Sequence, residues 1–200
     1  MAKVSKSVKT PRSGKIQYIV IHCTAGSMNA TAEEVERICL NRKNADGTYW
    51  QRCGYHYIIT KDGKVHQMLP DNCISNGVAN MNNICLNIAY TGGVLCNSNG
   101  TVKNERIAKD TRNDKQKEAL FKLVKELKNK YPDAKICGHN TFANKACPSF
   151  NVAAEFGNLY PDDVVSQKSN LADRQKKLNK KGEYKHYKAH KSEIDVVPQL

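Results

Sequence analysis

The sequence predicts an α/β fold, in which a single domain forms a mixed central β-sheet flanked by helices. Three observations support this prediction. The chain has 200 residues, of which 40% are hydrophobic and 26% charged, enough for one domain with a substantial core. Strand-like apolar runs alternate with helical patterns. The connections include both a tight hairpin and longer crossovers, which place antiparallel and parallel strand pairs in one sheet.

Runs rich in β-branched and aromatic residues predict strands over residues 16–22, 55–60, 65–69, 84–90 and 134–139. The turn Lys61-Asp62-Gly63-Lys64 separates the second and third runs and indicates a β-hairpin. The first run, IQYIVIH, has the composition of a buried strand.

Two helices carry clear start signals. Thr31 followed by Glu34, and Asn113 followed by Gln116, each form the sequence pattern of a capping box. The second helix has apolar residues at helical spacing from Leu120 onward and is expected to stop at Pro132. A last helical turn is expected within 150–156.

The charge distribution divides the chain into three parts. The net charge is +13, and much of the excess lies at the two ends. We therefore expect a basic N-terminal extension over 1–15, a folded domain over 16–160 and a basic C-terminal appendage over 161–200. Such charge favours polyanionic partners. No nucleic-acid recognition motif is found, so we expect no specific nucleic-acid partner.

No apolar run approaches the roughly 20 residues of a membrane-spanning helix, so no membrane span is expected. The basic start is not followed by an apolar core, which predicts cytoplasmic synthesis without a signal peptide.

Three side chains suggest a metal site. His22 and His139 each end a predicted strand, where functional sites collect in α/β sheets, and Cys147 follows eight residues after His139. Two imidazoles and one thiolate form a three-ligand zinc set with an open fourth position. Taken singly, a histidine at a strand end is more often a packed residue than a ligand. Cys137, which shares the strand face of His139, is the rival thiol.

Four motifs occur in order: IVIHCTAG (19–26), GYHYIITKDG (54–63), TGG (91–93) and GHN…KACPSF (138–150). Together they resemble the zinc-dependent N-acetylmuramoyl-L-alanine amidases, in the branch that includes bacteriophage lysozyme-amidases and peptidoglycan recognition proteins. The resemblance covers roughly residues 16–156.

The resemblance implies a function and a set of site residues. His22, His139 and Cys147 fall on the family's positions for ligands of Zn²⁺, and Tyr55 and Lys145 fall on its active-site tyrosine and lysine. It implies a hydrolase that cuts the amide between N-acetylmuramic acid and L-alanine in peptidoglycan. The alternative is a non-catalytic peptidoglycan-binding protein of the same fold. Without the resemblance, Tyr55 reads as a strand aromatic and Lys145 as a solvated loop cation.

The chain departs from the family pattern at two places. Asn87 stands where the family often has glycine, and residues 74–79 lack the histidine of the corresponding stretch in relatives. We expect these positions to border the substrate groove. We further expect a monomer that acts on the cell wall after release from the cell, helped by attraction to the anionic envelope.

Overall fold

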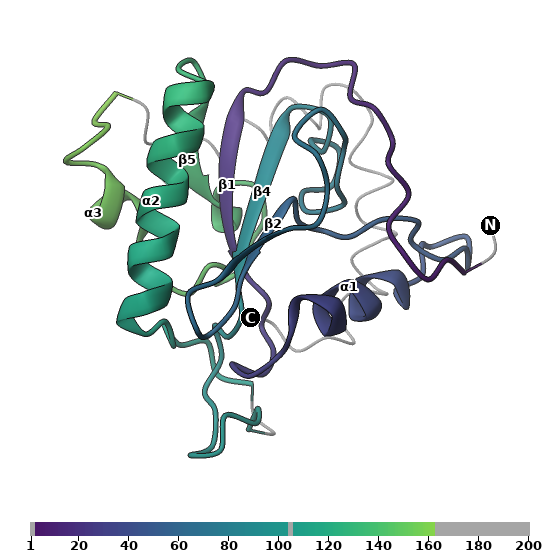
Figure 1. Cartoon of the computed structure of the whole chain (residues 1–200), viewed down its shortest axis with the longest axis horizontal. Helices are drawn as coiled ribbons and strands as arrows, with labels where there is room; N and C mark the ends of the chain where they lie inside the picture. Colours follow the sequence, from purple (N-terminus) through teal and green to yellow (C-terminus); the bar gives the residue numbers. More distant parts are fainter. Residues whose placement is uncertain (1–2, 104–105, 163–200) are drawn as a thin grey trace.

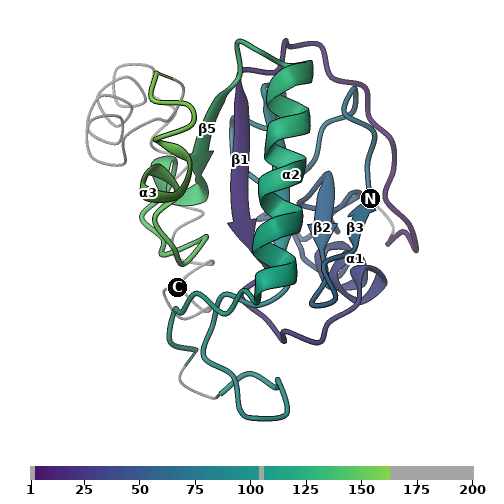
Figure 2. The same ribbon diagram turned by 60° about the vertical axis from the view of Figure 1, so that its left-hand side comes forward.

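In the computed structural model, which describes residues 3–103 and 106–162, five strands form one sheet in the order β3-β2-β4-β1-β5. β1 (Tyr18–Cys23) lies between β4 (Cys85–Tyr90) and β5 (Lys135–Gly138) and is parallel to both. β2 (Tyr57–Ile59) is parallel to β4 (Figure 1). β3 (Val65–Gln67) pairs with β2 as an antiparallel hairpin (Figure 2). The predicted α/β fold with a mixed sheet is confirmed.

Both predicted capping boxes are present. Thr31 and Glu34 exchange side-chain and backbone hydrogen bonds at the start of α1 (Ala32–Leu40). Asn113 and Gln116 do the same at α2 (Asp114–Lys130). These bonds satisfy backbone N–H groups that the first helical turn leaves without partners. Two short elements follow: η1 (His139–Thr141) and α3 (Val152–Phe156).

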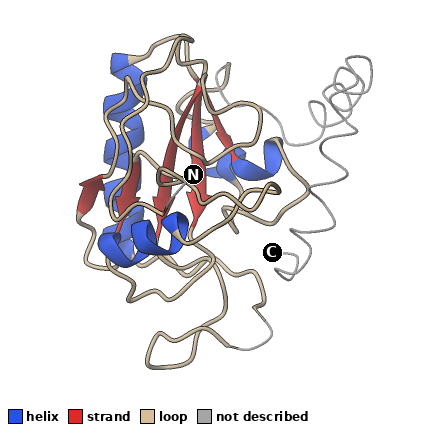
Figure 3. Cartoon of the chain, turned by 90° about the vertical axis from the view of Figure 1, so that its right-hand side faces the viewer, coloured by secondary structure: helices blue, strands red, loops and turns tan. Residues whose placement is uncertain are grey.

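The sheet is covered on both faces because alternate strand residues point to opposite sides. Ile19, Ile21 and Ile88 face α2 and form the larger core cluster with its apolar stripe of Leu120, Leu123, Val124 and Leu127. Ile58, on the opposite face, packs against Val35 and Cys39 of α1. Figures 2 and 3 show the sheet between these two helices.

The hairpin strands are shorter than the sequence predicts. The predicted run 55–60 forms a strand only at Tyr57–Ile59, and 65–69 only at Val65–Gln67. The backbone N–H groups of Met68 and Leu69 both donate to the carbonyl oxygen of His56, so the regular ladder ends there. Tyr55 therefore precedes the strand.

The N-terminal segment packs on the domain. The N–H of Val8 donates to the carbonyl of Gln51 at 2.7 Å, and the N–H of Ile74 donates to that of Thr10 at 2.8 Å. The predicted appendage 161–200 lies, apart from residues 161 and 162, outside the described residues. Among the described helices, none combines the length and apolar character that crossing a membrane requires.

Candidate active site

The parallel register of β1 and β5 brings two histidines together. Ile21 is the register partner of Gly138, so His22 and His139, the next residue of each chain segment, emerge side by side. Their ring centroids lie 4.6 Å apart. The sequence predicts that each histidine ends a strand; β1 runs one residue further, to Cys23, and His139 begins η1 directly after β5.

Cys147 reaches the two histidines from the loop after η1. The N–H of Asn140 donates to the carbonyl of Cys147 at 2.9 Å and closes this loop. The thiol Sγ lies 3.9 Å from His22 Nδ1 and accepts a hydrogen bond from the N–H of Cys23 at 3.3 Å. The candidate ligand atoms of His22, His139 and Cys147 all lie within 4.8 Å of one another.

The geometry of this trio fits a metal ion. Tetrahedral zinc with ordinary Zn–N and Zn–S bonds separates a nitrogen and a sulfur ligand by about 3.5 Å. The observed 3.9 Å is close to that separation. Cys137 packs instead with Val20, Val78 and Cys85 and does not belong to the trio. None of the eight cysteines, all within the described residues, forms a disulfide.

Burial controls the protonation of the three groups. Desolvation lowers the pKa of His22 to about 4 and that of His139 well below its usual value, and the nearby charge of Lys145 lowers both further. Both imidazoles are therefore neutral at neutral pH, and each keeps one ring nitrogen with a free lone pair. Desolvation raises the pKa of the Cys147 thiol well above its usual range. A cation between the three groups would favour the thiolate.

Tyr55 stands beside His22. The two ring centroids lie 5.4 Å apart, and the Tyr55 hydroxyl donates to the carbonyl of Cys23 at 3.5 Å. Desolvation raises the pKa of this phenol well above its usual value. The hydroxyl therefore keeps its proton at neutral pH and can donate a hydrogen bond.

Lys145 lies in the same loop as Cys147, on its exposed side. Partial desolvation is the main cause that lowers the pKa of its ammonium group, while the neighbouring Cys147 thiol acts in the opposite direction. The structure thus brings all five residues singled out from the sequence to one region.

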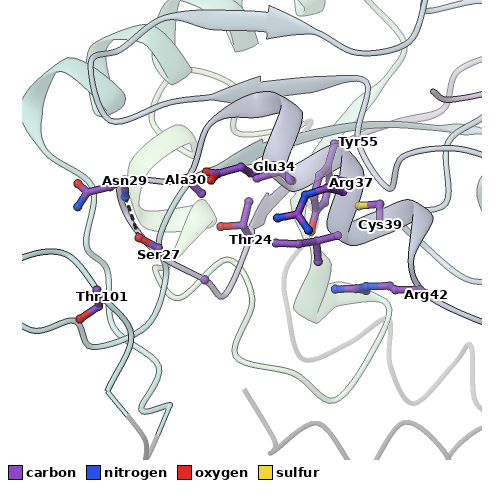
Figure 4. A pocket seen from close by; sticks show the side chains of 13 residues that line it. Thr24, Ser27, Asn29, Ala30, Glu34, Arg37, Cys39, Arg42, Tyr55 and Thr101 are labelled. Carbon is purple, nitrogen blue, oxygen red and sulfur yellow. Dashed lines mark hydrogen bonds between the residues drawn. The ribbon is translucent and has the colours of Figure 1, made fainter. Parts of the chain in front are cut away.

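A pocket of about 420 Å³ adjoins this region and includes Tyr55 and Thr24 in its wall. Figure 4 shows Arg37 and Glu34 of α1 near Tyr55, with Ser27, Asn29 and Thr101 toward the other end. Arg42 also lines the pocket. The wall is thus polar and carries charges of both signs.

The expectation that Asn87 and residues 74–79 border the substrate groove stays a prediction. Asn87, Ser75 and Val78 are buried and do not line the pocket. They lie behind His22, because β4 places Asn87 on the sheet face that carries His22. Sequence reasoning missed this role, although an asparagine inside the apolar run ICLNIAY is itself a signal of a buried hydrogen-bonded group.

Comparisons with known proteins identify the family of the chain. The family model described as N-acetylmuramoyl-L-alanine amidase matches residues 12–150. The endolysin of Enterobacteria phage K11 is 29% identical over 152 residues, covering 76% of this chain and 90% of the relative.

Two solved structures have the same fold. The Ph2119 endolysin from Thermus scotoductus MAT2119 bacteriophage Ph2119 has a TM-score of 0.59 and 28% identity, covering 76% of this chain and 90% of its own. The amidase LysC from Clostridium intestinale URNW has a TM-score of 0.58 and 23% identity, covering 80% and 99%. The chain therefore belongs to the N-acetylmuramoyl-L-alanine amidase family, and its relatives include phage endolysins.

Proposed function

We propose that this peptidoglycan amidase holds one Zn²⁺ between His22, His139 and Cys147. It then hydrolyses the amide that joins the lactyl group of N-acetylmuramic acid to L-alanine. The single observation that carries the proposal is the set of three ligand atoms within 4.8 Å of one another. Imidazole nitrogen and cysteine thiolate are both ligand types that zinc binds, and a set of three protein ligands leaves the fourth position of a catalytic site open.

A zinc ion in this site supplies Lewis-acid polarisation of the scissile carbonyl and acidification of water. The protein residues supply the rest. Tyr55 keeps its phenolic proton and donates a hydrogen bond to the oxyanion that develops on the carbonyl oxygen. Lys145 Nζ places positive charge beside the same oxygen. Its lowered pKa also makes its ammonium a better proton donor toward the departing amine nitrogen.

The adjoining pocket takes the peptide part of the substrate. Arg37 and Arg42 line this pocket and offer guanidinium groups to carboxylates of the stem peptide. Thr24 and Tyr55 belong to its wall, so a peptide bound there continues toward the three candidate ligands. The non-catalytic recognition alternative is not favoured, because the full set of two histidines and the cysteine is present.

We further propose where the chain acts, from the endolysins among its relatives and from its charge. The chain is synthesised in the cytoplasm and degrades the cell wall after release, as an endolysin does. It acts as a monomer. The net charge of +13 attracts the chain to the anionic envelope. Activity on intact walls, compared with activity on a soluble muropeptide, should then fall more steeply as salt is raised.

Product analysis tests the reaction. Purified peptidoglycan is digested with the full chain, and the products are identified by mass spectrometry and amino-terminal labelling. Free amino-terminal alanine with intact glycan strands is the expected result. New reducing sugar ends, or cleavage within the peptide, would contradict the assigned bond.

A further inference from the structure

The two ring nitrogens of His22 face different partners. Nδ1 lies 3.9 Å from the Cys147 thiol, on the side of the candidate metal site. Nε2 lies 2.8 Å from the side-chain oxygen Oδ1 of Asn87, on the opposite side. His22 is 1% exposed and Asn87 is not exposed at all, so water does not compete for this hydrogen bond.

Asn87 is itself held on several sides. Its side-chain Nδ2 donates to Ser75 Oγ at 2.8 Å. Its backbone N–H donates to His56 Nδ1 at 3.0 Å, and the N–H of His56 donates back to the carbonyl of Asn87 at 2.8 Å. A Cβ at Gly77 would lie 2.5 Å from Asn87 Cγ, so only glycine leaves room for this amide. The position of Oδ1 is therefore set before any metal binds.

We propose that Asn87 is a positioning residue that fixes the Nε2–H form of His22 and so presents Nδ1 to the metal. An amide oxygen cannot donate a hydrogen bond, so the proton of the shared bond must sit on His22 Nε2. The remaining nitrogen, Nδ1, then carries the free lone pair that a metal requires. The inference rests on the proposed metal site.

The buried position makes the alternative arrangement costly. If the His22 proton moved to Nδ1, the Nε2 lone pair would face the Asn87 oxygen, and two buried acceptors would be left without a hydrogen between them. Glycine, which the family often has at this position, offers no side-chain acceptor. In this chain, the acceptor for His22 Nε2–H is thus the Asn87 side chain of β4.

The tautomer can be measured on the unmodified chain. Long-range ¹H–¹⁵N spectra of the metal-free protein at neutral pH report which nitrogen of each histidine carries the proton, and a His22→Gln variant assigns the His22 signals. The Nε2–H form is expected. A predominant Nδ1–H form would overturn the proposal without any variant of Asn87.

Zinc affinity, measured by competition with a chromogenic chelator, gives the second readout. Asn87→Leu removes the acceptor at similar volume and should weaken Zn²⁺ binding about 10- to 100-fold. Asn87→Asp keeps an acceptor and should stay within a few-fold of the wild type. The matched control is Asn82→Leu. Asn82 is a half-buried asparagine that accepts from the N–H of Val78 and contacts no ligand, so its variant should keep full affinity.

The outcomes distinguish the positioning role of Asn87 from the proposed metal site itself. Unchanged affinity in Asn87→Leu, or equal losses in Asn87→Leu and Asn87→Asp, would overturn the positioning role. If Asn87→Leu does not fold, Asn87→Asp and the wild-type tautomer still decide. A wild-type chain that binds no zinc would overturn the metal site instead, while the tautomer of His22 would still report whether Asn87 directs it.

Discussion

His22 separates two regions that differ in how they are built. In front of it lie His139, Cys147 and Tyr55, which come from strand ends and loops and border a pocket. Behind it lies a buried hydrogen-bonded network of Asn87 and its partners on neighbouring segments. The front borders a pocket, whereas His56, Ser75 and Asn87 at the back are closed to solvent. The comparison teaches that the candidate ligands and the group that would orient one of them come from different parts of the chain.

The back network also extends to the N-terminal segment. Arg12 donates to the carbonyl oxygens of Asp71, Cys73 and Asn83 at 2.7–2.9 Å, and its guanidinium lies 3.0 Å from His56 Nε2. A segment that the sequence separates as a basic extension therefore reaches, through His56 and Asn87, toward a candidate ligand. The domain limit at residue 16 stays a prediction.

The largest expected effect is at the front. Cys147→Ser should abolish both stoichiometric zinc and amide cleavage, because it removes the single thiolate of the ligand set. Cys137→Ser is the matched control, since Cys137 is a buried thiol in the apolar cluster with Val20 and Val78. Elemental analysis and muropeptide cleavage are measured on both. Full zinc in Cys147→Ser together with zinc loss in Cys137→Ser would show that the rival thiol is the ligand.

Lys145 and Tyr55 should act on the transition state and leave metal binding intact. Lys145→Ala removes one oxyanion partner, and such losses lower turnover about 100- to 1,000-fold. Tyr55→Phe removes only the hydroxyl and should lower turnover with the fold preserved. Each variant is assayed for cleavage beside its zinc content. Near-normal turnover with full zinc in both would remove these residues from the mechanism, and zinc loss in either would assign it to the site's architecture.

A smaller effect, on the free energy of unfolding, is expected when the network behind His22 is changed. Arg12→Ala leaves several carbonyl oxygens without their donor, which should lower the free energy of unfolding by about 1–3 kcal/mol. Lys15→Ala is the control within the same segment. Its ion pair with Asp133 is exposed at 77% and 71%, and such surface pairs contribute about 0–1 kcal/mol. Urea denaturation compares the two; equal effects would mean that the segment does not support the back network.

The smallest expected effect is a loss of stability in acid that is not seen at neutral pH. Burial lowers the pKa of His56 to about 4, as it does for His22. The neutral folded form gains no proton as pH falls from about 6.5 to 4, whereas the unfolded chain does. The free energy of unfolding of the metal-free chain should therefore decrease as pH falls through that window. A pH-independent free energy of unfolding between those values would contradict the buried, neutral state of both histidines.

The front was predictable from the sequence, and the back was not. The β-branched run of β1 predicts a buried strand, and the resemblance to the family's motifs singles out His22, His139 and Cys147, whose ligand atoms lie within 4.8 Å of one another in the structure. Asn87 could not be assigned, because its partner depends on which strands are neighbours and in which register. The start of β2 at Tyr57, two residues after Tyr55, was missed for the same reason, since the hydrogen bonds that Met68 and Leu69 donate to His56 decide it.

The most direct test of the account is metal dependence. The full chain is purified and its zinc content is measured. Cleavage of a soluble muropeptide is then followed before chelation, after chelation and after Zn²⁺ is restored. The account predicts one zinc per chain, loss of cleavage on removal and recovery on return, with the Asn87→Leu variant needing more Zn²⁺ for recovery. Undiminished cleavage by the metal-free chain would contradict it.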